Sequence, residues 1–163
     1  MLDAVASKKD LLDYVKTLND KYQLSLTRDE DYFEPGMMEN LEQYKGEYDE
    51  LRNVIILRVE SKGLRYENRT QNLEKVSLND SIYVKRDSSN AFNSNNFTIE
   101  SEYGMTLGNL PADLCNALAP LYDSGYATIL TSTVSYIEKL RERSRYAKQG
   151  VMFVELHIKM RGI

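Results

Sequence analysis

The chain has 163 residues, of which 42% are hydrophobic, and a formal net charge of -4 at pH 7; this suits one globular domain, or one domain with a helical extension. No apolar run approaches the ~18 residues of a membrane-spanning helix, the start MLDAVASKKD lacks the order of a secretion signal, and a single cysteine and a single histidine exclude an internal disulfide and, effectively, a Cys/His zinc site. We therefore expect a soluble, cytoplasmic protein with no membrane contact, no metal and no other cofactor.

Charge is divided unevenly along the chain. Residues 1–50 carry six Lys and Arg against thirteen Asp and Glu, whereas residues 51–163 carry fifteen against twelve. The acidic segment can repel nucleic acid while the remainder attracts it.

Two helical patterns lie in the acidic segment. Residues 7–22, SKKDLLDYVKTLNDKY, and residues 37–52, MMENLEQYKGEYDELR, both place apolar residues at helical spacing, although Gly46 weakens the second pattern. The apolar positions are Leu11, Leu12, Tyr14, Val15, Leu18 and Tyr22 in the first, and Met37, Met38, Leu41, Tyr44, Tyr48 and Leu51 in the second. We predict an acidic helical extension over residues 1–50, which either packs on the rest of the chain or binds a protein partner.

From residue 53 the apolar period changes to two. NVIILRVE, SIYVKRD, NNFTIES, YATILTSTVSYI and VMFVELHIKM are typical of strands, and PADLCNALAPLYDSG, residues 111–125, predicts one helix among them. The pattern indicates a mainly β fold of the α+β class. We expect residues 51–163 to form a small β-barrel of the OB or SH3 type with an embedded helix.

Catalytic signatures are missing from the sequence. It contains no Gly-rich phosphate loop, no nucleophile elbow and no paired metal ligands. His157 alternates with apolar neighbours as a structural histidine does, and Cys115 falls on the apolar face of the predicted helix. We expect a protein that is not an enzyme.

Two segments suit binding instead. The run KLRERSRYAK, residues 139–148, combines Arg141, Arg143 and Arg145 with Tyr146, which suits phosphates and unstacked bases or, equally, a solvated loop. The segment GLRYENR offers the planar guanidinium of Arg65 and the stacking face of Tyr66.

In chain order these pieces resemble a HIRAN domain, from about Val54 to about Met160. A strand leads into GLRYENR, SIYVKRD and an Asn-rich loop follow, and YGMTLGNLPADLCNALAPLYDSG carries the most specific part. That part has a Gly, a short strand that ends in Gly-x-Leu, and a helix that ends near Asp-x-Gly. The resemblance implies an OB-like module that binds single-stranded DNA, including its ends, in DNA repair or processing, without catalysis of its own.

The resemblance also implies site residues. Arg65 and Tyr66 match an Arg-Tyr pair that contacts DNA in the family, and Arg86, Asp87, Asn90 and Asn95 match its loop motif. At four loop positions and one strand end this chain differs from the family: Phe92 replaces a Tyr, Asn93 an Asp, Ser88 and Ala91 two prolines, and Asn109 a His.

These differences have physical consequences. Phe92 can stack on a base but has no phenolic donor, and Asn93 keeps an acceptor oxygen without the charge. Loss of the two prolines predicts a less preorganised loop. We therefore predict single-stranded nucleic-acid binding, DNA or RNA, through Arg65, Tyr66, Arg86, Asn90, Phe92, Asn93, Asn109, Arg141, Arg143 and Arg145. The alternative is a protein-interaction or regulatory domain that kept the fold without recognising a 3′ end.

Overall fold

The computed structural model describes residues 2–28 and 43–161. A long helix, α1 (Leu2–Arg28), comes first, and the strands β1 (Lys45–Asp49) and β2 (Val54–Glu60) follow. Next come two short helical turns, α3 (Arg69–Asn72) and η2 (Leu73–Lys75), and three strands, β3 (Ile82–Asp87), β4 (Asn96–Ser101) and β5 (Thr106–Asn109). The helix α4 (Ala112–Asp123), the long strand β6 (Ala127–Glu138), the turn η3 (Leu140–Glu142) and β7 (Val151–Met160) complete the chain.

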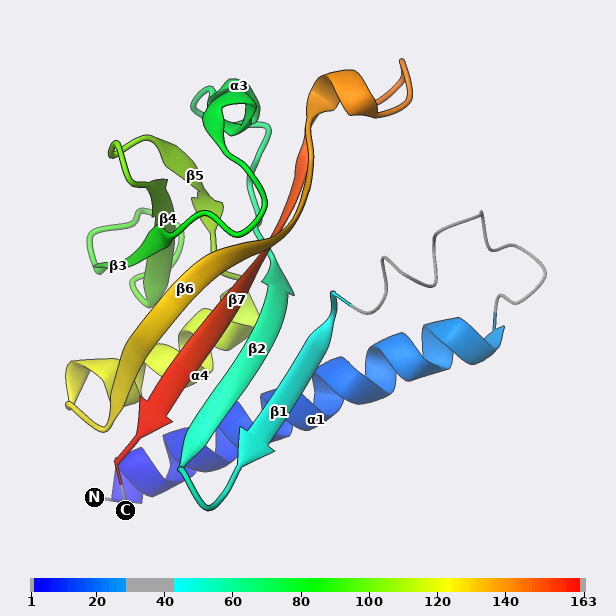
Figure 1. Ribbon diagram of the computed structural model, residues 1–163. Helices are drawn as coiled ribbons and strands as arrows, with labels where there is room; N and C mark the ends of the chain where they lie inside the picture. The colour runs from blue at the N-terminus through cyan, green and yellow to red at the C-terminus, as the bar shows by residue number, and fades with distance from the viewer. Residues whose placement is uncertain (1, 29–42, 162–163) are drawn as a thin grey trace.

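The strands form two antiparallel sheets, drawn in Figure 1. One has the order β1-β2-β7-β6 and the other the order β3-β4-β5. Isolated bridges join the sheets where Lys62 pairs with Asn109 and where Ser81 pairs with Thr133. The predicted α+β class, with an N-terminal helix and a helix embedded among the strands, is confirmed.

The core lies between the two sheets and α4. Alternate residues of β2, Ile55, Leu57 and Val59, are buried, as period-two strands require. The apolar face of α4 is buried as well, and Pro120 lies inside the helix, which continues to Asp123. This apolar face fixes the start of α4 next to the end of β5, where the candidate site forms.

Helix α1 packs on the domain by its apolar stripe. Leu11, Val15 and Leu18 are buried, and the helix contacts α4 and β1. The amide side chain of Asn19 exchanges two hydrogen bonds with the backbone of Gly46, at 2.7 and 3.0 Å. The packing that we predicted for this helix is therefore present in the chain itself.

The second predicted helix is wrong where the structure describes it. Residues 45–49 form β1, which pairs with β2 from Lys45 opposite Arg58 to Asp49 opposite Val54. Leu51, predicted on the apolar face, is fully exposed in the hairpin turn. The boundary that we placed after residue 50 falls in this turn, and the predicted apolar positions Met37, Met38 and Leu41 lie outside the described residues.

Among the helices that the structure describes, none combines the length and apolarity needed to cross a membrane.

Candidate functional site

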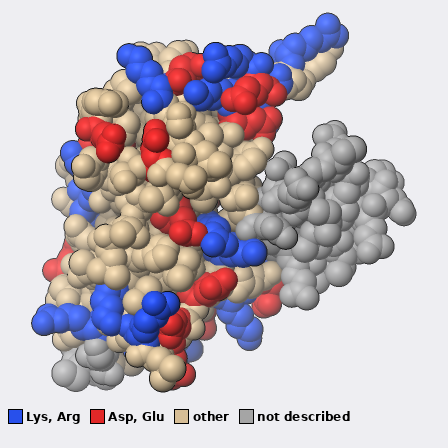
Figure 2. Space-filling model, viewed as in Figure 1, with Lys and Arg blue, Asp and Glu red and all other residues tan. Residues whose placement is uncertain are grey.

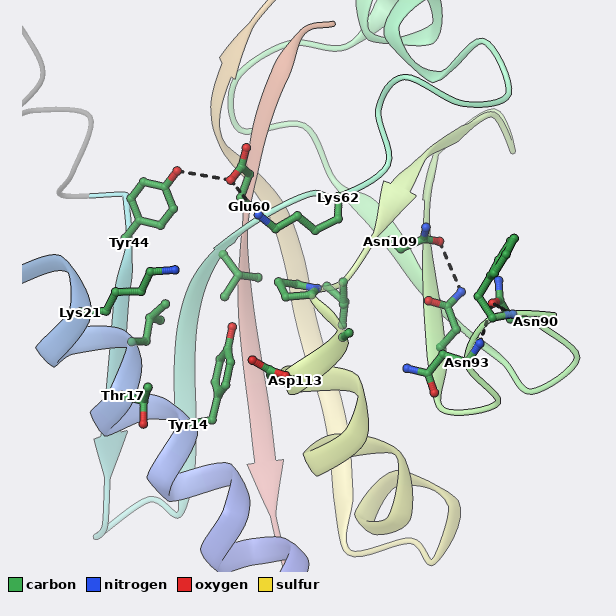
Figure 3. Close-up of a pocket in the computed structure, with 17 residues that line it drawn as sticks. Tyr14, Thr17, Lys21, Tyr44, Glu60, Lys62, Asn90, Asn93, Asn109 and Asp113 are labelled. Carbon is green, nitrogen blue, oxygen red and sulfur yellow. Dashed lines mark hydrogen bonds and ion pairs between the residues drawn. The ribbon is translucent and has the colours of Figure 1, made fainter. Parts of the chain in front are cut away.

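A pocket of about 550 Å³ opens between α1, the end of β2, the loop after β3 and the start of α4 (Figure 3). Four of the predicted site residues line it: Asn90, Phe92, Asn93 and Asn109. Its other polar and aromatic lining residues are Tyr14, Thr17, Lys21, Tyr44, Glu60, Lys62, Asn96 and Asp113. Side-chain amides and the ring of Phe92 thus dominate the wall that the β3–β4 loop and β5 provide.

The Asn-rich loop between β3 and β4 is fixed by its own side chains. Asn90 accepts hydrogen bonds from the backbone N–H groups of Phe92 and Asn93, at 2.9 and 3.0 Å, as in an Asx turn. Asn93 in turn accepts one from the backbone of Asn95, at 3.0 Å, and donates to Asn116 of α4, at 3.1 Å. The Phe92 ring is 99% exposed at the edge of the pocket.

Asp87 holds the two ends of this loop together. Its carboxylate accepts hydrogen bonds from the side chains of Ser89, Asn90, Asn96 and Thr98, at 3.2 to 3.4 Å. Burial alone would raise the pKa of Asp87, but these donors outweigh it and hold the pKa below its ordinary value of 3.8. Asp87 is therefore ionised at neutral pH, and its carboxylate stabilises the loop.

Arg86, a predicted site residue, anchors the loop to the end of α4. Its guanidinium makes a bidentate pair with Asp123, both distances 3.0 Å, and donates to the carbonyls of Ser94 and Asn96, at 2.7 and 3.2 Å. Only 15% of its side chain is exposed. This pair gives a structural reason for the Asp of the Asp-x-Gly turn, and it assigns Arg86 a positioning role.

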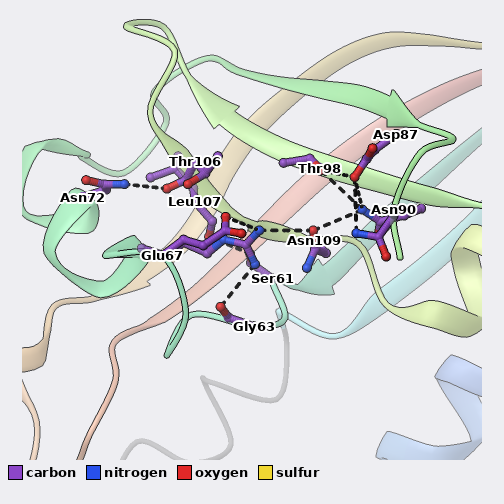
Figure 4. A network of polar contacts seen from close by, with 12 residues as sticks. Ser61, Gly63, Glu67, Asn72, Asp87, Asn90, Thr98, Thr106, Leu107 and Asn109 are labelled. Atoms are coloured by element: carbon purple, nitrogen blue, oxygen red, sulfur yellow. Dashed lines mark hydrogen bonds and ion pairs between the residues drawn. The ribbon is translucent and has the colours of Figure 1, made fainter. Parts of the chain in front are cut away.

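Asn109 reaches the pocket because Gly108 allows a close backbone approach. Gly108 has a φ of +141°, and a Cβ there would lie 1.8 Å from the Ser61 hydroxyl and 2.8 Å from the Lys62 carbonyl. Asn109 then bridges to Lys62 through two backbone hydrogen bonds of 2.9 Å, while its side-chain oxygen accepts a bond from Asn96, at 3.3 Å (Figure 4).

Arg65 and Tyr66 lie beside the pocket rather than in its lining. The Arg65 guanidinium lies over the Tyr66 ring at 4.9 Å and donates to its hydroxyl at 2.7 Å. A Cβ on Gly63 would lie 3.6 Å from that ring and 3.3 Å from the Asn109 amide nitrogen, so Gly63 separates the ring from the pocket wall. Tyr66 is 54% exposed, which leaves a face for stacking.

Arg69, which was not among the predicted site residues, joins the loop of residues 63–69 to the pocket. It is buried, and it donates to the Gly63 carbonyl at 3.2 Å, to Glu67 at 3.2 Å and to Asn109 at 3.5 Å. Figure 4 shows the resulting chain of polar contacts from Glu67 through Asn109 to Asp87. Arg69 is the last residue of GLRYENR, but the sequence alone does not indicate that a basic residue in a loop is buried.

The basic run occupies the tip of the β6–β7 hairpin, which extends past the body of the domain (Figure 1). Arg141 pairs with Glu74 at 3.5 Å, Arg143 donates to the Gln149 carbonyl at 2.8 Å, and Arg145 lies over the Tyr146 ring at 4.9 Å. Figure 2 shows Lys and Arg at this tip with Asp and Glu among them. The hairpin and the pocket are separate regions, so one groove does not hold all the predicted site residues.

Two reactive residue types fall outside the pocket lining. Burial raises the pKa of Cys115 to about 11, so its thiol stays protonated. His157 lies 2.9 Å from Glu155 on β7, and Glu155 also pairs with Arg58 at 2.6 Å. Among residues 4–21 and 43–161, no group of three or more His, Cys, Asp or Glu side chains could hold a metal ion.

Sequence and structure comparisons with known proteins identify related domains. Residues 55–151 match the HIRAN domain family. No curated protein sequence matches. The fold is similar to a protein from Lactobacillus plantarum, 16% identical, with a TM-score of 0.50 over 64% of this chain and 95% of that one.

Two structures of the HIRAN domain of HLTF are also similar. The crystal structure of the human domain is 22% identical, with a TM-score of 0.48 over 64% of this chain and 76% of that one. An NMR structure of the domain in its DNA-bound conformation is 20% identical, with a TM-score of 0.42 over 64% and 75%. Because the family match spans more than half of the chain, this protein belongs to the HIRAN domain family.

Proposed function

We propose that this HIRAN domain binds single-stranded nucleic acid, with single-stranded DNA the preferred ligand, as a module without catalysis of its own. The observation that carries the proposal is Phe92, a large apolar ring that is 99% exposed on a loop fixed by hydrogen bonds. An exposed ring held in place is what stacking on an unpaired base requires. A role in DNA repair or processing would follow from the family.

The pocket beside Phe92 suits a base. Its amide groups, from Asn90, Asn93, Asn96 and Asn109, each carry both a donor and an acceptor, which the edges of bases also present. Much of this capacity is already used in the loop, so the remaining donors and acceptors are held in fixed directions. A base that stacks on Phe92 would meet these groups at its edge.

A strand that leaves the pocket past Asn109 would next meet Tyr66 and Arg65. Tyr66 would stack a second base, and Arg65 would bind a phosphate. Beyond them, residues 63–75 contact the basic hairpin, since Thr70 accepts from the backbone of Gly150 and Lys139 donates to the carbonyl of Glu74. The hairpin would then supply further phosphate contacts.

The test measures fluorescence anisotropy with labelled single strands of DNA and RNA at low salt. Replacing Phe92 by Ala should weaken binding about 5- to 150-fold, the equivalent of ~1–3 kcal/mol of lost stacking. The fold should be unaffected, because the ring is almost fully exposed. Tyr103→Ala is the matched control, since Tyr103 is 81% exposed in the β4–β5 turn, at the opposite end of β4.

Three results would count against the proposal or narrow it. No binding by the wild-type chain would favour the protein-interaction alternative. If Phe92→Ala and Tyr103→Ala lose the same amount of affinity for single strands, the pocket is not the binding site. Equal affinity for strands with free and blocked 3′ ends would keep strand binding and remove end recognition, which Phe92 and Asn93 would otherwise provide in place of the family's Tyr and Asp.

A further inference from the structure

Helix α1 supplies one wall of the pocket, although it precedes the residues that match the family. Tyr14, Thr17, Leu18 and Lys21 line the pocket from this helix. The helix is held in that position by its buried Leu11 and Val15 and by the two hydrogen bonds between Asn19 and Gly46. The wall is therefore a fixed part of the described structure.

Charges of opposite sign lie at the two ends of this wall. Lys21 extends from α1 toward the end of β2, on the side where Lys62 lies (Figure 3). Nearer the N-terminus of α1, Asp10 and Asp13 line a second hollow of about 340 Å³ together with Asp113 of α4. At a rise of ~1.5 Å per residue, Asp13 and Lys21 are about 12 Å apart along the helix, more than the Debye length of ~8 Å at physiological salt.

The N-terminus of α4 does not offset the negative charge of Asp10 and Asp13. A helix N-terminus ordinarily attracts anions. Here Asp113 lies in the first turn of α4 and lines both hollows, so its carboxylate opposes that attraction. A phosphate would be repelled on this side of the pocket and attracted on the other.

Lys62 alone is a weak candidate for attracting a backbone phosphate to this end of the pocket. Its ammonium is paired with Glu60 at 3.1 Å, and Glu60 also accepts from Tyr44 at 3.4 Å. A phosphate at Lys62 must compete with that carboxylate. Lys21 adds a second cation at the same end of the pocket from a different element.

We propose, on the basis of the function proposed above, that α1 sets the path of the bound strand. Lys21 contacts a backbone phosphate where the strand passes the end of β2, and the carboxylates of Asp10, Asp13 and Asp113 keep the backbone from the opposite side. The N-terminal segment is thus part of the nucleic-acid site, and it determines the side on which the strand leaves the pocket.

The test uses the full chain and a labelled single-stranded DNA across a series of salt concentrations. Lys21→Ala should weaken binding about 3- to 10-fold and reduce the slope of log K against log salt by about 0.7, as expected for one lost phosphate contact. Lys21→Arg should keep the slope. Lys16→Ala is the matched control, since Lys16 is exposed on α1 and lines neither hollow.

The acidic side is tested by Asp13→Asn, which should strengthen binding about 2- to 3-fold. Its control, Glu102→Gln in the exposed β4–β5 turn, removes the same charge and should have a smaller effect. If the wild-type chain binds but Lys21→Ala behaves as Lys16→Ala, the path is wrong and the proposed function stands. If Asp13→Asn matches Glu102→Gln, the repulsive part of the proposal is overturned. No binding by the wild-type chain would overturn the proposed function itself.

Discussion

Replacing Gly108 with Ala should break the contact between β5 and the end of β2. The new Cβ would lie 1.8 Å from the Ser61 hydroxyl and 2.8 Å from the Lys62 carbonyl, so either β5 or the segment that follows β2 must move. Overpacking of this kind costs about 1–3 kcal/mol, and a φ of +141° adds about 1–3 kcal/mol for a residue with a side chain. The sum, about 2–6 kcal/mol, is a large part of the ~5–15 kcal/mol that stabilises a typical domain.

Thermal unfolding followed by circular dichroism measures the effect. At about 2–4 °C per kcal/mol for a chain of this size, a loss near the middle of the range, ~4 kcal/mol, lowers Tm by about 8–16 °C. Gly104→Ala is the matched control, because Gly104 has a φ of +80° but nothing within 4 Å of its Cβ position. It should lose only about 1–2 kcal/mol from strain.

A second substitution separates the clash from the strain. Ser61→Ala removes the hydroxyl that the new Cβ would meet, at the expense of its hydrogen bond to the Leu107 carbonyl. In the double variant the combined loss should be smaller than the sum of the two single losses. The reasoning is refuted if Gly108→Ala and Gly104→Ala lower Tm equally, or if the two single losses add.

Three further predictions concern the loop and the hairpin. Arg86→Ala should lower the free energy of unfolding in urea by about 2 kcal/mol, because it removes charge-assisted bonds to Asp123 and to two loop carbonyls; no change would contradict the positioning role. Because the pKa of Asp87 is lowered in the folded state, its carboxylate stabilises the fold above pH 3.8, the ordinary value, and this contribution is lost as the pH falls through the folded-state pKa. As the pH is lowered below 3.8, the urea midpoint should therefore fall less in Asp87→Asn than in the wild type. Arg145→Ala should reduce the salt slope of DNA binding by about 0.7 if the hairpin holds a phosphate, and an unchanged slope would exclude that contact.

The missed strand β1 shows where sequence patterns fail in this chain. Tyr44, Tyr48 and Leu51 have helical spacing, yet their neighbour Gly46 is buried under α1, where a Cβ would lie 2.9 Å from Val15. That contact joins positions about thirty residues apart, and a local period cannot report it. Gly46 was the one local signal against the helix. After residue 53, β2 and α4 each bury one face, which the period of the sequence records.

The candidate site likewise contains residues that could be predicted from the sequence and residues that could not. Asn90, Phe92, Asn93 and Asn109, which line the pocket, could be found because the resemblance to the HIRAN family pointed to their positions, although only Asn90 has the family's residue type. Lys21 could not, since it reaches the pocket only through the packing of α1. The hairpin arginines were selected by composition, and composition does not tell whether a basic run faces the same groove as a distant loop.

The β3–β4 loop replaces two prolines with side-chain hydrogen bonds. Loss of the prolines at Ser88 and Ala91 predicted a loosely organised loop, since a compatible proline stabilises a fold by about 0.4–1 kcal/mol through the unfolded chain. The loop instead carries two bonds from backbone N–H groups to Asn90, and each contributes about 0.5–1.5 kcal/mol. Bonds to Asp87 and from Arg86 add to these. The free energy from these hydrogen bonds thus matches what the two prolines would contribute. The bonds to Asn90 come from the backbone of Phe92 and of its neighbour Asn93. Under the proposed function, the fixed loop holds the Phe92 ring, which is 99% exposed, in position to stack on a base.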